Sequence, residues 1–223
     1  MPATLGSFGI VVAFVAAILG VVAQLASLRL AATGRPVPAW LDGRRLLVLV
    51  CAGVLLAVGS MEYALVTHDF SLAYVAENNA TVTPLLYSIT GMWSALEGSI
   101  LLWALLLTIV ASVFVVRCRR RHADPVVGWA TAVLLATDAF FLGLIAGPAS
   151  PFALTASTAP LQGAGPNVLL QDNPLVAIHP PLIYAGLVLF TVPFALVVGA
   201  SRAATPSPAG RWRARRRRGR RAP

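Results

Sequence analysis

Five long apolar segments, separated by more polar loops, constrain this sequence more than any other feature. A soluble domain carries roughly 25% charged residues, whereas this chain of 223 residues carries 11% and is 58% hydrophobic. Each segment supplies the roughly 20 residues that an α-helix needs to cross a hydrocarbon core. We therefore predict an all-α fold, a polytopic transmembrane bundle of five helices. The spans run near Leu5–Leu28, Leu46–Val66, Met92–Val116, Val126–Ala146 and Pro180–Ala200.

The basic residues are all arginines, and they lie on one side of the predicted membrane. Three arginine-bearing segments alternate with two arginine-free loops: 29–45, 117–125 and 201–223 against 67–91 and 148–178. Cytoplasmic loops of membrane proteins are enriched in arginine and lysine. We therefore expect the amino terminus outside and the carboxyl terminus in the cytoplasm, which puts His68 and His179 on the outer face.

The composition changes abruptly after Ala200. Residues 201–223 contain no Leu, Val, Ile or Phe, so this segment cannot bury a core and is expected to be disordered. We expect a transmembrane helical domain over 1–200 and an arginine-rich cytoplasmic tail over 201–223. The tail could contact anionic headgroups of membrane lipid. Arginine runs also bind nucleic acid, but nothing else in the chain supports a nucleic-acid partner. We favour a third interpretation, an out-of-frame extension of a gene for a longer protein.

The two cysteines, Cys51 and Cys118, fall near the predicted cytoplasmic side, where thiols stay reduced. Neither belongs to a CxxC or CxxCH motif, so the chain is not itself a c-type cytochrome. We expect both cysteines to be unpaired and inert.

Two acidic residues stand out because a carboxylate within a bilayer is costly. Glu97 follows Trp93 by one turn and is expected to share its helix face. It either has a functional role or marks the water boundary at a helix amino terminus. Asp138 lies about 18 Å into the fourth span, at 1.5 Å per residue. We favour a packing hydrogen bond to Gln24 or to a threonine; the alternative is a proton relay, as in a transporter or a proton-coupled permease.

His179 stands at the start of the fifth span, directly before Pro180 and Pro181. A residue before proline avoids helical geometry, and proline suits the first helical turn, so the imidazole is expected at the mouth of the helix. The partly positive helix amino terminus favours neutral imidazole, which is the form that binds metals. This geometry permits a metal ligand and equally permits a hydrogen-bonded structural residue.

Two motifs resemble those of the CcmF family, the haem-handling membrane proteins of bacterial cytochrome c maturation. The first is Tyr74-Val-Ala followed by Trp93-Ser-Ala-Leu-Glu-Gly-Ser-Ile-Leu-Leu-Trp103, and the second is Asn173-Pro-Leu-Val-Ala-Ile-His-Pro-Pro-Leu-Ile-Tyr184. Ser94-Ala95 replaces the glycine pair that is typical of the family. Both motifs fall on the predicted outer face, and the resemblance extends from about Leu5 to Ala200.

The resemblance implies that His179 is an outer-face axial ligand to the iron of haem. It also implies that haem is delivered to apocytochrome c at the bacterial inner membrane. Trp93, Glu97, Tyr74 and Tyr184 are then expected to shape the cofactor-binding site. The expected partners are apocytochrome c, a haem chaperone and other cytochrome c maturation proteins.

The sequence also departs from the family pattern. A tryptophan-rich outer segment, further helices and further haem-ligand histidines follow in the family, and none of these occurs in this sequence. The family acts as a haem lyase within a complex, so the catalytic residues of this chain stay unknown, and an inactive truncated product is a further alternative. The family pattern assigns no ligand role to His68.

Overall fold

The computed structural model describes residues 1–121, 123–156, 158–168 and 174–204, and its fold is all-α. Five helical segments are long and apolar enough to cross a membrane, which confirms the predicted number of spans. Four of them are continuous helices and the fifth consists of two: α1 (Pro2–Ala32), α2 (Leu47–Val66), α5 (Leu96–Arg117), α6 (Pro125–Ala146), and α8 (His179–Leu189) with α9 (Thr191–Ala204). The tail predicted at 201–223 lies outside the described residues from 205 onward.

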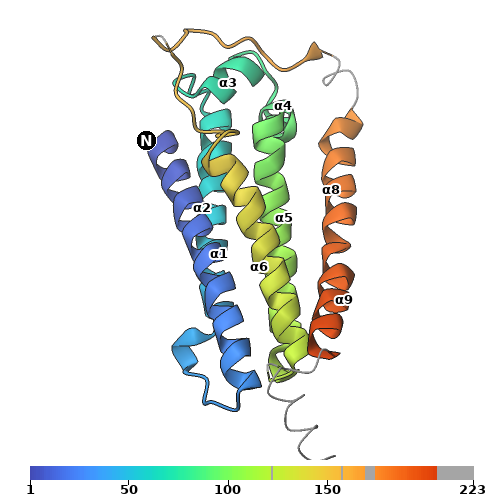
Figure 1. The fold of residues 1–223 in the computed structure, drawn as a ribbon. Coiled ribbons are helices and arrows are strands. Elements are labelled where there is room, and N and C mark those ends of the chain that lie inside the picture. Colours follow the sequence, from blue (N-terminus) through green and yellow to red (C-terminus); the bar gives the residue numbers. More distant parts are fainter. Residues whose placement is uncertain (122, 157, 169–173, 205–223) are drawn as a thin grey trace, which may run out of the picture.

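The long helices run roughly parallel to one another and form a bundle (Figure 1). Helix α1 packs against α2 and α6, and α5 also packs against α2 and α6, so these four close into a ring. Helix α8 packs on the outside against α5, and α9 packs against α6. The fifth span is therefore the least buried of the five.

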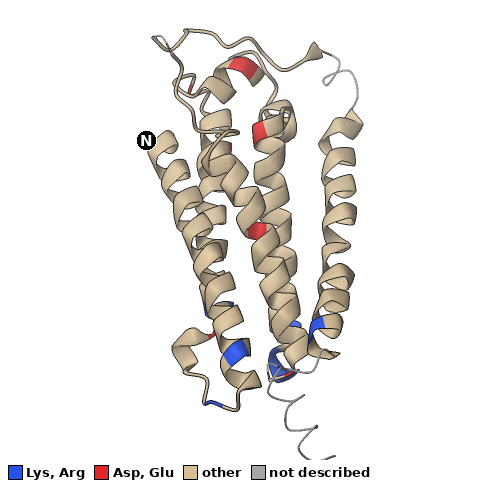
Figure 2. Ribbon diagram, viewed as in Figure 1, with Lys and Arg blue, Asp and Glu red and all other residues tan. Residues whose placement is uncertain are grey.

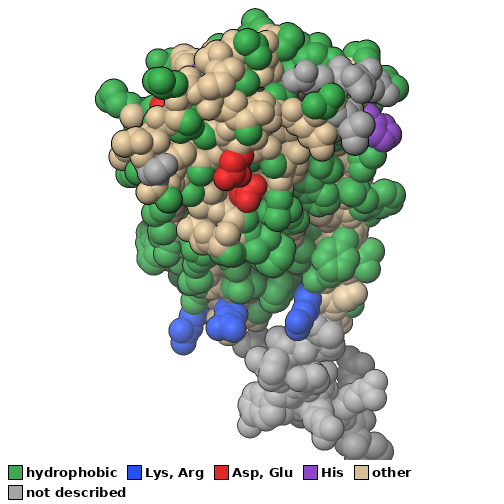
Figure 3. Space-filling model, turned by 90° about the horizontal axis from the view of Figure 1, so that it is seen from above, with side chains coloured by type: hydrophobic (Ala, Val, Ile, Leu, Met, Phe, Trp, Pro, Cys, Tyr) green, Lys and Arg blue, Asp and Glu red, His purple; other side chains and the backbone are tan. Residues whose placement is uncertain are grey.

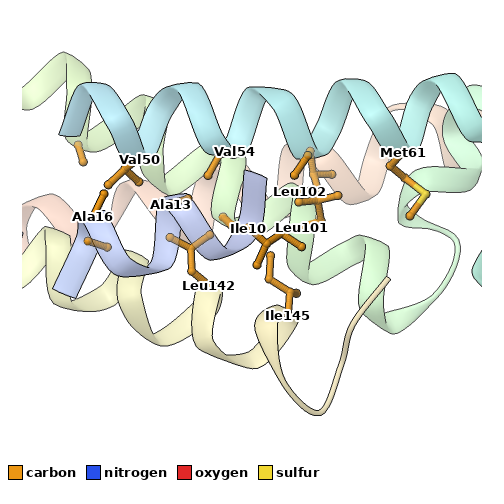
Figure 4. Close-up of a cluster of buried hydrophobic side chains, with 14 of the residues drawn as sticks. Ile10, Ala13, Ala16, Val50, Val54, Met61, Leu101, Leu102, Leu142 and Ile145 are labelled. Atoms are coloured by element: carbon orange, nitrogen blue, oxygen red, sulfur yellow. The ribbon is translucent and has the colours of Figure 1, made fainter. Parts of the chain in front are cut away.

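The core of the ring is built from aliphatic side chains on all four helices. Figure 4 shows Ile10 of α1, Val54 of α2, Leu101 of α5 and Leu142 of α6 pointing toward one another. Small residues let the backbones approach closely, as is usual between membrane helices. A Cβ atom on Gly9 would lie 2.5 Å from the carbonyl oxygen of Gly53, so α1 and α2 can meet there only because both positions are glycine.

The fifth span, expected as one helix, is divided at Phe190. Pro193 has no amide hydrogen to donate to the carbonyl of Leu189, and its ring clashes with that carbonyl in a straight helix. Helix α8 ends at Leu189, the residue whose carbonyl Pro193 cannot bond. The proline rule thus explains the division.

Two loops join at the end of the bundle that lacks arginine. The first contains α3 (Ala73–Asn78), α4 (Leu85–Thr90) and the short 3-10 helix η3 (Gly91–Trp93). Leu72 and Leu154 form an isolated antiparallel bridge, and the Ala73 amide donates to the carbonyl of Ala153 at 2.9 Å. The loops before α5 and after α6 are therefore hydrogen-bonded to each other.

Asn79 connects these two loops to the helical bundle through hydrogen bonds. Its side chain is fully buried and donates to the carbonyl of Leu65, at the end of α2, at 2.6 Å. Its backbone carbonyl accepts from the amide of Gly165, in the loop after α6, at 3.1 Å. One asparagine thus ties α2 to both loops.

Charge is segregated between the two ends of the bundle. The arginines lie at one end, and most of the acidic residues lie at the other (Figure 2). In the view from above, hydrophobic side chains occupy much of the visible face, and a small group of acidic side chains lies near its middle (Figure 3). Cys51 and Cys118 are unpaired, as predicted. The arginine-bearing segments of the sequence thus meet at one end of the folded bundle, as expected when such segments share one side of a membrane.

Candidate functional site

Tyr74 closes the turn that leads into α5. Its side chain is buried, with 5% exposed, and its hydroxyl donates to the carbonyl oxygens of Gly91 and Met92 at 2.8 and 3.0 Å. The same hydroxyl accepts from the amide of Ala95 at 3.3 Å. Tyr74 therefore braces a turn 17–21 residues further along the chain.

This turn corrects two sequence-based predictions, the start of the third span and the shared face of Trp93 and Glu97. Helix α5 begins at Leu96 rather than at Met92, because Ala95 is extended, with φ −134° and ψ 174°. Trp93 lies before that break, in η3, whereas Glu97 lies after it, in α5. The prediction that Trp93 and Glu97 share one helix face is therefore wrong.

Gly98 lets the turn and the helix meet. A Cβ atom at this position would overlap the carbonyl oxygen of Met92 and the hydroxyl of Tyr74. The glycine of the first motif thus has a packing reason, since only hydrogen fits between α5 and the braced turn.

Hydrogen bonds and ring contacts join the two sequence motifs. The Trp93 indole nitrogen donates to the carbonyl of Val176, in η5 (Pro174–Ala177), at 3.0 Å. The Tyr184 hydroxyl donates to the Ser99 hydroxyl at 3.4 Å. The rings of Trp103 and Tyr184 lie 5.3 Å apart between centroids. The segment around His179 is therefore held against the start of α5 on both sides of the histidine.

His179 is the first residue of α8, followed by the two prolines at the first helical turn, as predicted. Its side chain is exposed and makes no hydrogen bond to a residue that the structure describes. Residues three and four positions along a helix share a face, and here these are Leu182 and Ile183, which are 63% and 44% exposed. An accessible imidazole thus stands above a strip of exposed aliphatic surface.

Tyr184 faces a different direction from His179. Five residues correspond to about 140° around an α-helix of 3.6 residues per turn. Tyr184 points toward Trp103 of α5, so His179 is directed away from that contact. The two side chains therefore have different surroundings, although they belong to one motif.

Glu97 lies in the first turn of α5 and is half-buried. Its carboxylate makes no hydrogen bond or ion pair with a residue that the structure describes. Burial raises the pKa of the Tyr74 hydroxyl well above its ordinary value, and the charges of Glu97 and Glu62 raise it further. Glu97 is thus an electrostatic neighbour of the Tyr74 brace and keeps its own hydrogen-bonding capacity.

Asp138 is fully buried near the middle of α6. Its Oδ1 atom accepts from the Thr108 hydroxyl of α5 at 3.3 Å, which confirms the predicted packing bond to a threonine. Gln24 is not its partner, since Gln24 lies near the arginine-bearing end. The Oδ2 atom has no hydrogen-bond partner among the described residues.

His68 ends helix α2 rather than forming part of this site. Its backbone adopts the left-handed conformation, with φ 54°. Its amide bonds the Leu65 carbonyl at 3.3 Å, and the next amide, that of Asp69, bonds the Ala64 carbonyl at 2.9 Å. This is a Schellman cap, a position usually taken by glycine. No group of three or more His, Cys, Asp or Glu side chains able to hold a metal ion occurs in the described part of the chain.

Comparisons with known proteins place these features in context. The family model described as cytochrome C assembly protein matches residues 93–206. The chain is 38% identical, over 152 residues, to the cytochrome c-type biogenesis protein CcmF of Pseudomonas fluorescens, and the match covers 67% of this chain and 22% of that protein. It is 35% identical, over 158 residues, to CcmF of Escherichia coli strain K12, with 70% of this chain and 23% of that protein covered.

The fold is similar to that of a solved structure, named cytochrome c heme lyase CcmF. The TM-score is 0.71 at 35% sequence identity, and the match covers 90% of this chain and 30% of that chain. The chain spans about a fifth of the length of the CcmF proteins of Pseudomonas fluorescens and Escherichia coli.

Proposed function

Because this chain belongs to the cytochrome c assembly protein family, that of CcmF, as a multi-pass protein of the bacterial inner membrane, we propose that it binds haem on its outer face. The haem is cargo, presented for covalent attachment to apocytochrome c. The observation that carries the proposal is the exposed imidazole of His179, held at the first turn of α8.

In this proposal the arginine-bearing end of the bundle faces the cytoplasm. The support is the segregation of charge between the two ends (Figure 2) together with the arginine enrichment of cytoplasmic loops. His179, the joined loops and Glu97 then lie at the outer membrane surface, where apocytochrome c is modified.

His179 is the iron ligand. Histidine is a common axial ligand of haem iron, and an accessible ring nitrogen is the requirement that the local geometry meets. The exposed side chains of Leu182 and Ile183 on the same helix face offer apolar surface for the porphyrin plane. The absence of a larger His, Cys, Asp or Glu cluster among the described residues fits a porphyrin-bound iron better than a bare ion, which needs several protein ligands.

Trp93, Tyr184 and Tyr74 act as positioning residues. The Trp93 bond to Val176 fixes the segment just before His179, and Tyr184 fixes the helix just after it. Tyr74 holds the turn that carries Trp93. Together they keep the imidazole at one place relative to α5, and preorganised ligands bind more tightly because less motion is lost on binding.

Glu97 contacts a partner in this proposal. A carboxylate with hydrogen-bonding capacity at a helix amino terminus is suited to a basic group on a haem chaperone or on apocytochrome c. The thioether bonds form in the assembled maturation machinery, and the residues of this chain bind and orient the haem there.

The test is haem retention by the full chain purified in detergent, measured by Soret absorbance and by pyridine haemochrome content. His179→Ala should lose most of the bound haem, and added imidazole should restore the Soret band by replacing the missing ligand. The matched control is His68→Ala, which changes a histidine at the same end of the bundle and should retain haem.

A Soret band of unchanged position and intensity in His179→Ala would refute the ligand role. Equal loss in His179→Ala and His68→Ala, without rescue by imidazole, would also refute it, because both changes would then act through the fold.

A further inference from the structure

A pocket of about 890 Å³ lies at the arginine-bearing end of the bundle, opposite the site described above. Its walls come from the last turns of α1, the loop between α1 and α2, the start of α6 and the end of α9. The volume lies within the range of roughly 300–1,000 Å³ typical of small-molecule sites. The lining includes Gln24, Leu28, Val37, Arg45, Trp129 and Arg202.

Gln24 is a polar side chain buried in the wall of this pocket. It is 2% exposed, and its Oε1 atom has no hydrogen-bond partner among the described residues. A buried acceptor without a donor carries a free-energy cost. A ligand that brings a hydroxyl or ammonium donor into the pocket would remove this cost.

The charge of the pocket is positive. The carboxylates in its walls are already engaged: Asp42 bonds Arg44 at 2.7 Å, and Asp124 accepts from the amide of Val126 and from Arg121. Those bonds hold the pKa of Asp124 below its ordinary value, so it stays ionised and paired.

Arg45 and Arg202 are both part of the pocket lining. The Arg45 guanidinium forms no ion pair with any residue of the described ranges. The Arg202 guanidinium lies over the ring of Trp129, 5.7 Å from its centroid. An anion between Arg45 and Arg202 would meet two cations near the membrane surface.

The same walls are partly apolar. Leu28 and Val37 line the pocket beside Trp129, and tryptophans prefer the interface between hydrocarbon and headgroups. A free phosphate ion would leave this aliphatic surface without a partner. A lipid would cover it with its acyl chains while its headgroup reached the arginines.

We propose that this pocket binds the headgroup of an anionic glycerophospholipid. The phosphate lies between Arg45 and Arg202, and a headgroup hydroxyl donates to Gln24 Oε1. Basic pockets between membrane helices are suited to anionic headgroups. The lipid joins the end of α9 to α1 and α6, so it adds a contact between the bundle and its least buried span. The site is independent of haem.

The experiment is native mass spectrometry of the full chain in detergent, with phosphatidylglycerol and phosphatidylcholine added in equal amounts. The wild-type protein should retain phosphatidylglycerol preferentially. Arg45→Ala should weaken its binding about five-fold, corresponding to about 1 kcal/mol per arginine near a headgroup. Gln24→Leu, which keeps the size of the side chain, should weaken it several-fold as well.

The matched control is Arg29→Ala. Arg29 is an exposed arginine on the same stretch of α1 that does not line the pocket, so its removal should leave lipid binding unchanged. Equal retention of both lipids, or equal weakening by Arg29→Ala and Arg45→Ala, would overturn the proposal. Displacement of the lipid by millimolar inorganic phosphate would also overturn it, and would identify a free-anion site instead.

Discussion

Removing the hydroxyl of Tyr74 tests whether the turn before α5 is held as described. Tyr74→Phe keeps the buried ring, so no cavity forms. The Gly91 carbonyl keeps a donor, because the Ser94 hydroxyl also bonds it at 2.8 Å. The Met92 carbonyl loses the donor that it has at 3.0 Å, and the Ala95 amide loses the acceptor that it has at 3.3 Å. A half-buried donor left unpaired costs about 1–3 kcal/mol, so the free energy of unfolding should fall by about that amount.

The measurement is reversible unfolding in mixed detergent micelles, with the free energy extrapolated to zero denaturing detergent. Tyr63→Phe is the matched control, because Tyr63 is 62% exposed and its hydroxyl makes no hydrogen bond to any described residue. Equal changes in the free energy of unfolding for the two substitutions would refute the stabilising role of the Tyr74 hydroxyl.

The same variant has a pH signature. Burial raises the pKa of Tyr74 above its ordinary value of 10.0 in the folded chain. The unfolded chain therefore releases this proton first as the pH rises. The contribution of Tyr74 to stability is complete below pH 10 and is lost above it. Tyr74→Phe should accordingly lose less stability than the wild type between pH 10 and 11.

Two further substitutions test the packing described above. Gly98→Ala should lower the free energy of unfolding by about 3 kcal/mol or more, since the added methyl group meets backbone atoms. Gly59 is a helical glycine with open space around it, so Gly59→Ala should be neutral or slightly stabilising. Similar losses in both variants would contradict the close approach at Gly98. Thr108→Val should cost about 0.6 kcal/mol, the average for hydrogen bonds between membrane helices, and at most about 1.7 kcal/mol. Asp138→Asn should cost less, because its amide oxygen can still accept from Thr108. The opposite order in detergent unfolding would exclude a packing role for Asp138.

The positions of the five spans could be predicted because hydrophobicity summed over about 20 residues is a robust signal. The division of the fifth span at Phe190 can also be predicted from the sequence, since Pro193 removes the hydrogen bond to the Leu189 carbonyl. The start of α5 cannot be predicted in this way. The Ala95 amide, just before this start, donates to the Tyr74 hydroxyl, and a hydroxyl 21 residues upstream leaves no trace in local hydropathy.

In the candidate site, too, local sequence predicts some features, whereas others depend on residues far apart in the chain. Residue type and the two prolines indicated an accessible imidazole at the mouth of the last span, and His179 lies there. The bond from Trp93 to Val176 joins residues 83 positions apart. No spacing within either motif encodes it. The pocket around Gln24 was missed for a similar reason, because its walls come from four separate segments.

The distance along the chain between Trp93 and Val176 also sets an order of biosynthesis. A membrane protein leaves the ribosome amino terminus first, so the indole is inserted while its acceptor has not yet been translated. The same holds for Ser99 and its tyrosine partner, 85 residues later. The first four spans can therefore be complete in the bilayer before the histidine exists. Under the proposed function, a nascent chain therefore gains its haem ligand only when its last helix is inserted.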